Sequence, residues 1–140
     1  MSKLILLVDD DVTTLASLFP VLEQAGHRVI VAPGGKEAVK AIGTARFDVV
    51  VTDIFMPDLD GLELIRLARI ADPKLRIVAM SDYDRHSGFH VLAIAKQLGA
   101  DATLQKPIEI EQLLSAVAER PSAASRAALR EEESTNAAEF

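Results

Sequence analysis

The sequence predicts an α/β domain built on an open, doubly wound parallel sheet with five strands and five helices. Short apolar segments rich in Val, Ile and Leu alternate with stretches whose apolar residues recur at helical spacing. Three of these segments are apolar nearly throughout, which is typical of strands covered on both faces. Such alternation implies right-handed crossovers and a parallel sheet, and five units are too few to close an eight-stranded barrel.

Five apolar segments are the expected strands. They cover residues 4–8, 28–32, 48–52, 75–80 and 102–104. The expected helices lie between and after them, at residues 12–25, 35–44, 61–71, 87–98 and 110–117. The first helix ends at Gly26, a residue type that commonly stops helices. Pro20 should kink this helix, because proline lacks a backbone N–H and clashes with the preceding turn.

Length and composition restrict the class of protein. The 140 residues suffice for one domain with a real core and are too few for two ordinary domains. The net charge of −6 argues against binding to a nucleic-acid backbone, and the absence of Cys excludes disulfides and Cys-based zinc sites. With no signal peptide and no apolar run of membrane-spanning length, we expect a cytoplasmic protein. The expected domain is residues 1–120, followed by an Ala/Ser/Glu-rich mobile tail or the start of a linker at 121–140.

The residues that end the strands carry the chemistry, because open α/β sheets bind ligands outside the carboxyl ends of their strands. The second strand ends in Ala-Pro-Gly, which offers no reactive group. The other four end in Asp9, Asp10 and Asp11, in Asp53, in Ser81 and Asp82, and in Lys106. We therefore expect three carboxylates, one hydroxyl and one ammonium group to meet at one edge of the sheet.

These groups suit a phosphoryl group and a divalent cation. Asp9, Asp10 and Asp53 would repel one another, so without a cation at least one of them should have a raised pKa. Oxygen ligands with free coordination positions favour Mg²⁺, which binds readily beside a phosphate. Lys106 would add a compact positive charge and Ser81 a hydrogen bond. The set forms an electrostatic clamp in which Asp53 is the best-placed nucleophile.

Four segments carry a family resemblance: LILLVDDD, DVVVTDIFMPDLDGLEL, IVAMSD and GADATLQKPI, in that order. Over about residues 1–120 the chain resembles the receiver domains of two-component response regulators, the CheY-like members of the flavodoxin-like class. The resemblance implies strand order 2-1-3-4-5, with Asp53 accepting a phosphoryl group from a phosphohistidine on a histidine kinase or phosphotransfer protein.

The same resemblance implies roles for the residues around Asp53. Asp10, Asp53 and the backbone carbonyl of Phe55 would hold Mg²⁺ directly, and Asp9 would act mainly through water. Lys106 and Ser81 would contact the phosphoryl oxygens, and the Lys106–Pro107 peptide would be cis.

Plainer interpretations compete for several of these residues. Asp9 and Asp10 could cap the first helix, although Asp11 is better placed for that. Asp58 and Asp60 suit a turn and a helix cap. His86 and His90 are spaced like a metal-binding pair on a helix, but no third ligand is evident, so they are expected to be surface or packing residues.

The chain also departs from the family. Thr103 occupies the position, three residues before the lysine, where the family usually has Tyr or Phe as a rotating switch. Asp82 replaces a small residue and should point outward to avoid repelling a phosphate. Phe55 and Tyr83 flank the expected approach of water to the phosphorus, and their bulk should slow hydrolysis of an aspartyl phosphate.

No DNA-binding or catalytic output segment is evident, so we expect a phosphoacceptor that acts by binding. It would promote its own phosphorylation and dephosphorylation without a separate enzymatic activity. A downstream protein or a second copy would bind the face formed by the fourth helix, fifth strand and fifth helix. The alternative is a pseudo-receiver that binds partners without phosphorylation. A haloacid-dehalogenase-type phosphatase is disfavoured, because Phe55 stands where a second Asp is needed.

Overall fold

The computed structural model describes residues 2–82 and 88–119. The strands are β1 (Leu4–Val8), β2 (Arg28–Ala32), β3 (Val49–Asp53), β4 (Arg76–Asp82) and β5 (Ala102–Lys106). The helices are α1 (Val12–Gln24), α2 (Gly35–Thr44), α3 (Gly61–Ala71), α4 (Gly88–Leu98) and α5 (Ile110–Ala118). All strands are parallel and their order is β2-β1-β3-β4-β5, so the predicted flavodoxin-like sheet is confirmed.

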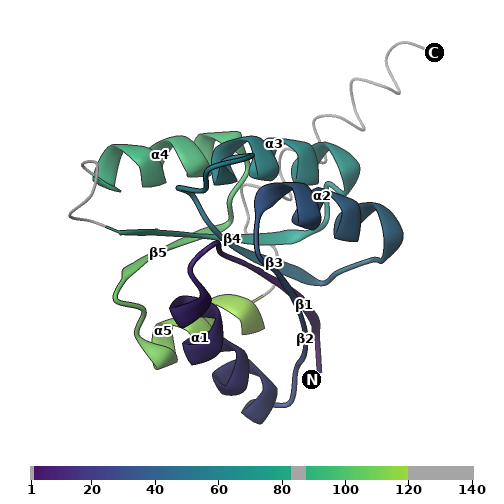
Figure 1. Ribbon diagram of the computed structural model, residues 1–140, viewed down its shortest axis with the longest axis vertical. Coiled ribbons are helices and arrows are strands. Elements are labelled where there is room, and N and C mark those ends of the chain that lie inside the picture. The colour runs from purple at the N-terminus through teal and green to yellow at the C-terminus, as the bar shows by residue number, and fades with distance from the viewer. Residues whose placement is uncertain (1, 83–87, 120–140) are drawn as a thin grey trace.

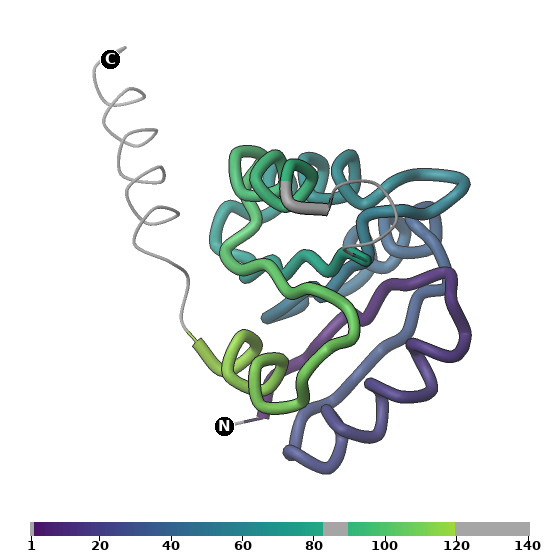
Figure 2. Tube along the Cα trace, turned by 90° about the vertical axis from the view of Figure 1, so that its left-hand side faces the viewer, coloured from purple at the N-terminus to yellow at the C-terminus, as the bar shows by residue number. Residues whose placement is uncertain are grey.

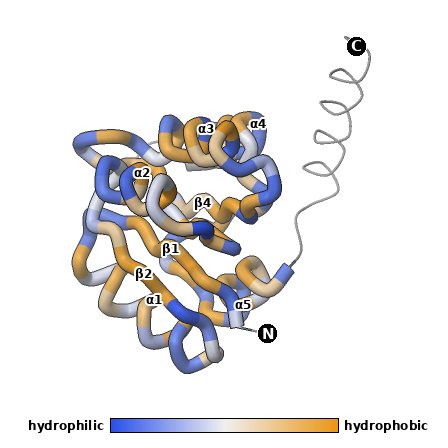
Figure 3. Tube along the Cα trace, turned by 90° about the vertical axis from the view of Figure 1, so that its right-hand side faces the viewer, coloured by the Kyte–Doolittle hydropathy of each residue, from blue (hydrophilic) through white to orange (hydrophobic). Residues whose placement is uncertain are grey.

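Helices cover both faces of the sheet, with α2, α3 and α4 on one side and α1 and α5 on the other (Figure 1). Each face has its own apolar core. Leu6 and Val50 pack with Ile65 of α3 on the first side, whereas Leu7 and Val51 pack with the apolar stripe of α1 and α5 on the second. Alternate residues of one strand thus enter opposite cores, as strand geometry requires. Figure 3 shows the strands as mainly apolar segments, whereas polar and apolar residues are interspersed along the helices.

The predicted element boundaries agree with the structure to within about two residues, and the largest differences are at the carboxyl ends of β4 and β5. Both strands run further than their apolar segments, because Ser81 pairs with Gln105 and Asp82 pairs with Lys106 in the ladder. Polar side chains at these positions hide the strand ends from a pattern based on hydrophobicity. The extension places the predicted site residues Ser81 and Lys106 on regular, hydrogen-bonded backbone.

The C-terminal end of α5 lies at the other end of the strands, near the first residues of β1 and β4. Arg76, a buried residue at the start of β4, donates from Nε to the carbonyl of Ala116 at 2.7 Å and pairs with Glu119 at 3.1 Å. Lys3 Nζ donates to the Val117 carbonyl at 2.8 Å and to the next two carbonyls. The start of β1 accordingly lies beside the end of α5 (Figure 2). These cations supply the positive charge that helix C-termini favour and that α5 itself lacks in its last turn.

Within the described ranges, no helix has the length and apolar character needed to span a membrane.

Candidate functional site at the carboxyl edge of the sheet

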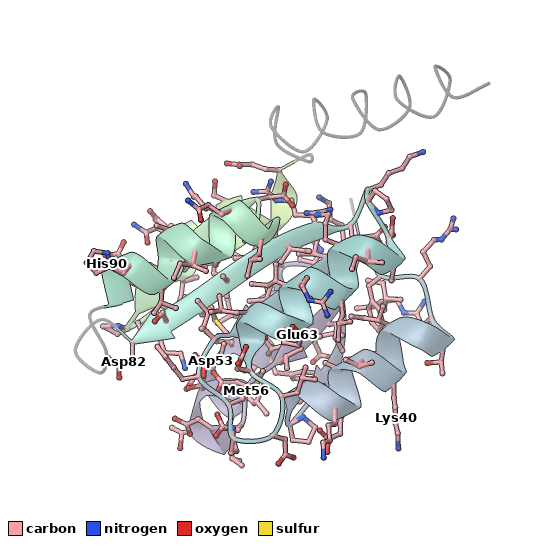
Figure 4. The ribbon with its side chains drawn as sticks, turned by 90° about the horizontal axis from the view of Figure 1, so that it is seen from above. Lys40, Asp53, Met56, Glu63, Asp82 and His90 are labelled. Atoms are coloured by element: carbon pink, nitrogen blue, oxygen red, sulfur yellow. The ribbon has the colours of Figure 1, made fainter. Side chains whose placement is uncertain are left out.

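Four strands bring the predicted site residues to one edge. Asp9 and Asp10 directly follow β1, and Asp53 is the last residue of β3. Ser81 lies at the end of β4 and Lys106 is the last residue of β5. Asp53 pairs with Met80 in the ladder, so Ser81 follows one residue beyond its level. The ends of β3 and β4, marked by Asp53 and Asp82, lie on the same side of the molecule, whereas Lys40 of α2 points away (Figure 4).

Lys106 connects two of the carboxylates. Its Nζ lies 2.8 Å from Asp9 Oδ2 and 3.2 Å from Asp53 Oδ1. Asp9 is fully buried, and its other oxygen accepts the Asp11 backbone N–H at 2.9 Å. Burial lowers the pKa of Lys106, but the hydrogen bond to Asp9 and the charges of both carboxylates outweigh that effect and raise it. The ammonium group is therefore held in its charged form between the two acids.

Asp9, Asp10 and Asp53 form the carboxylate cluster that the sequence predicts. One oxygen of each lies within 4.8 Å of the others. Burial and the neighbouring charge of Asp9 raise the pKa of Asp53 from 3.8 to about 6, despite the opposing effect of Lys106. One ammonium group thus does not compensate the buried negative charge. The cluster fits a divalent cation, because hard oxygen donors with one exposed member, Asp10, leave room for water ligands.

Ser81 is a fully buried polar residue at the same edge of the sheet, and its hydroxyl has an unsatisfied hydrogen-bonding capacity within the described residues. Its Oγ is buried and has no hydrogen-bond partner within the described part of the chain. An unsatisfied buried hydroxyl typically costs about 1–3 kcal/mol. Such groups recur at functional sites, where a ligand supplies the missing partner.

The β3–α3 loop leads the chain away from Asp53. The loop closes through a 2.7 Å hydrogen bond from the Gly61 N–H to the Ile54 carbonyl. A Cβ at Gly61 would lie 2.2 Å from the Asp53 carbonyl oxygen, so only glycine permits this close approach. Phe55 is partly exposed in the loop and Met56 is buried beside it. The sharp turn keeps the Asp53 side chain at the end of the sheet.

Other acids serve as helix caps. Asp11 accepts the Thr13 N–H at 2.9 Å and begins α1, and this hydrogen bond lowers its pKa. Asp60 accepts the Glu63 N–H at 2.9 Å and begins α3. Both were predicted caps and are confirmed. Neither is needed to explain the carboxylate cluster.

The remaining predicted features have mixed outcomes. The Lys106–Pro107 peptide is cis, as expected. Asp82 is partly exposed at the end of β4, and its outward orientation stays a prediction. His90 is exposed in the first turn of α4, whereas its predicted pair His86, and Tyr83, lie outside the described residues.

Thr103 lines a hollow on the surface between α4, β5 and α5. The hollow has a volume of about 400 Å³ and is lined by Leu92, Ala93, Lys96, Thr103, Leu104, Gln105 and Gln112. Among the residues that the structure describes, no aromatic side chain contributes to its lining. Thr103 and this hollow lie on the face that the sequence predicts to bind partners.

Comparison with known proteins identifies the class. A family model described as the response regulator receiver domain matches residues 5–118, and the chain belongs to this family. Receiver domains act in two-component signal transduction as phosphoacceptors, interact with histidine kinases or phosphotransfer proteins, and are generally Mg²⁺-dependent.

Individual relatives are similar over most of this chain. Sporulation initiation phosphotransferase F of Bacillus subtilis (strain 168) is 28% identical over 117 residues, which cover 84% of this chain and 92% of that protein. Response regulator MprA of Mycolicibacterium vanbaalenii is 39% identical over 111 residues, covering 79% of this chain and 47% of that protein. The chain thus spans about half the length of the MprA relatives it matches.

Solved structures agree with the fold. A receiver domain protein from Clostridium thermocellum has a TM-score of 0.75 at 28% identity, covering 81% of this chain and 90% of that one. NtrX from Brucella abortus, in complex with ADP, has a TM-score of 0.79 at 30% identity, covering 96% of this chain and 30% of that one.

Proposed function

We propose that Asp53 accepts a phosphoryl group from a phosphohistidine of a histidine kinase or phosphotransfer protein. The main support is the position of Lys106, whose ammonium group lies between Asp9 and Asp53 within a cluster of three carboxylates. In the transfer, an Asp53 carboxylate oxygen forms a bond to phosphorus and the phosphorus–nitrogen bond breaks. The electron pair of that bond leaves with the imidazole. The products are an aspartyl phosphate and a free histidine.

The remaining site residues orient and stabilise that group. Asp9, Asp10, Asp53 and the Phe55 carbonyl are the proposed Mg²⁺ site, with Asp9 acting mainly through water; the cation, when bound, neutralises charge on the phosphoryl oxygens. Lys106 can pair with one of these oxygens without leaving the edge of the sheet. The Ser81 hydroxyl, which has no hydrogen-bond partner among the described residues, can donate to another. Each group acts where negative charge accumulates during transfer.

The output is a change in binding rather than a second chemical reaction. Phosphorylation adds about −1.5 to −2 charges at the strand ends. Contacts of the phosphoryl group with Ser81 and Lys106 would bias β4 and β5, the two strands that lead to α4 and α5. The downstream protein, or a second copy of the domain, would bind the α4–β5–α5 face, which includes the hollow at Thr103.

Phosphorylation of the purified chain tests this proposal. Intact-mass measurement after incubation with acetyl phosphate and Mg²⁺ should show one added phosphoryl group, and none after Asp53→Asn or with EDTA. Beryllofluoride with Mg²⁺ should shift the amide resonances of Ser81 and Lys106. An unmodified mass together with an unchanged spectrum would favour the pseudo-receiver alternative.

A further inference from the structure

We propose that Gly35, at the start of α2 and outside the phosphorylation site, is a positioning residue for the β3–α3 loop. This loop, residues 54–60, carries the Phe55 carbonyl. Gly35 would therefore set the affinity of the site for a divalent cation. The inference rests on the proposed function, because that function assigns the Phe55 carbonyl to the metal site.

The evidence is a close contact between two segments that are far apart in the sequence. A Cβ at Gly35 would lie 2.2 Å from the carbonyl oxygen of Leu59 and 2.8 Å from its Cβ. The φ angle of Gly35 is not in the left-handed region, so its backbone conformation does not require glycine. The requirement is space, because the atom in the way belongs to the loop backbone and cannot rotate aside.

The loop has little room to move away from a Cβ added at Gly35. Its ends are joined by the hydrogen bond between Gly61 and Ile54. Ile54 is 1% exposed and Met56 is 8% exposed, so both anchor it to the core. At its far end, Gly61 already touches the Asp53 carbonyl. A displacement at Leu59 must therefore be taken up by the less buried residues of the loop, which include Phe55.

Helix α2 has little room to retreat either. Gly34 and Gly35 are buried at its start, and Ala38, one turn later, is fully buried in the core beneath α2 and α3. Moving the helix outward would open that core, and cavities in close-packed cores are costly. Any side chain introduced at position 35 would thus occupy space that the loop backbone already fills.

Gly43 provides a matched control in the same helix. A Cβ there meets no atom within 4 Å, and the residue is exposed. Gly35→Ala and Gly43→Ala each add one methyl group to α2 and each replace a glycine. Only Gly35→Ala adds it against the loop.

The test is a Mg²⁺ titration followed by the amide resonances of the ¹⁵N-labelled chain. Gly35→Ala should weaken Mg²⁺ binding about tenfold, the size of effect typical of residues that orient metal ligands. It should also shift the Ile54, Phe55 and Leu59 amides before metal is added. Gly43→Ala should leave the affinity and those amides unchanged.

An unchanged Mg²⁺ affinity in folded Gly35→Ala would overturn the proposal. If Gly35→Ala does not fold, Leu59→Ala tests the loop side of the contact. It removes the Leu59 Cδ2, which would lie 2.8 Å from a Cβ at Gly35, so the loop packs less tightly against the start of α2 and should hold the cation more weakly. Unchanged Mg²⁺ binding there would also overturn the proposal. Failure of the proposed function is distinguishable, because the wild-type chain would then gain no phosphoryl group from acetyl phosphate, and loss of the metal site itself would leave no Mg²⁺-dependent shifts at Asp10, Asp53 and Phe55 of the wild-type chain.

Discussion

Replacing Asp53 with Asn should stabilise the metal-free domain at neutral pH. The carboxyl is buried, with 5% of its side chain exposed, and its pKa is raised from 3.8 to about 6, chiefly by burial and then by the charge of Asp9. The folded chain therefore binds the Asp53 proton more tightly than the unfolded chain. Stability is lost as pH rises through the window between these two values, and the full penalty remains above about pH 6.

The size of the effect follows from the shift. A change from 3.8 to about 6 corresponds to about 3 kcal/mol. Asn resembles the protonated carboxyl in shape and carries no charge at any pH. Asp53→Asn should thus gain up to about 3 kcal/mol in free energy of unfolding at pH 7.5, and the gain should disappear below about pH 4.

Urea unfolding in EDTA, followed by circular dichroism, measures this difference at both pH values. Asp10→Asn is the control, because it removes one negative charge from an exposed member of the same cluster and should change stability by less than about 1 kcal/mol. Mg²⁺ should reduce the advantage of Asp53→Asn, since a bound cation compensates the wild-type carboxylates. Equal or lower stability of Asp53→Asn at pH 7.5 without metal would refute this electrostatic account.

Three further changes test separate parts of the structure. Lys106→Met removes the cation between Asp9 and Asp53, so phosphorylation by acetyl phosphate should slow by about tenfold or more; an unchanged initial rate by mass spectrometry would contradict this role. Phe55→Asn should open the approach of water and shorten the lifetime of the aspartyl phosphate, as timed after removing the donor; the same lifetime as wild type would exclude the shielding role. Arg76→Met leaves the Ala116 carbonyl without its side-chain donor and should cost about 1–3 kcal/mol by urea unfolding, whereas no loss would mean that water replaces the bond.

The sequence by itself predicted the fold and the polar side chains that end the strands at one edge of the sheet. Apolar segments alternating with helical stretches specify a covered parallel sheet. In such a sheet the carboxyl ends of the strands lie at one edge, so Asp9, Asp10, Asp53, Ser81 and Lys106 could be placed together before any distance was known. The caps at Asp11 and Asp60 followed from local rules, because a cap bonds to N–H groups two or three residues away.

Only the tertiary structure decided how these groups interact. The pKa of Asp53 is raised by burial and by the nearby charge of Asp9. The two ion pairs of Lys106 depend on its distances to Asp9 after β1 and to Asp53 on β3. The contacts of Lys3 with the end of α5 join residues 114 apart, and no sequence pattern signals them. Gly35 likewise starts the helix predicted at residues 35–44, but its close approach to Leu59 depends on how α2 packs against the β3–α3 loop. Periodicity shows which face of an element is buried, but steric contact and charge interaction depend on how separate elements pack in three dimensions.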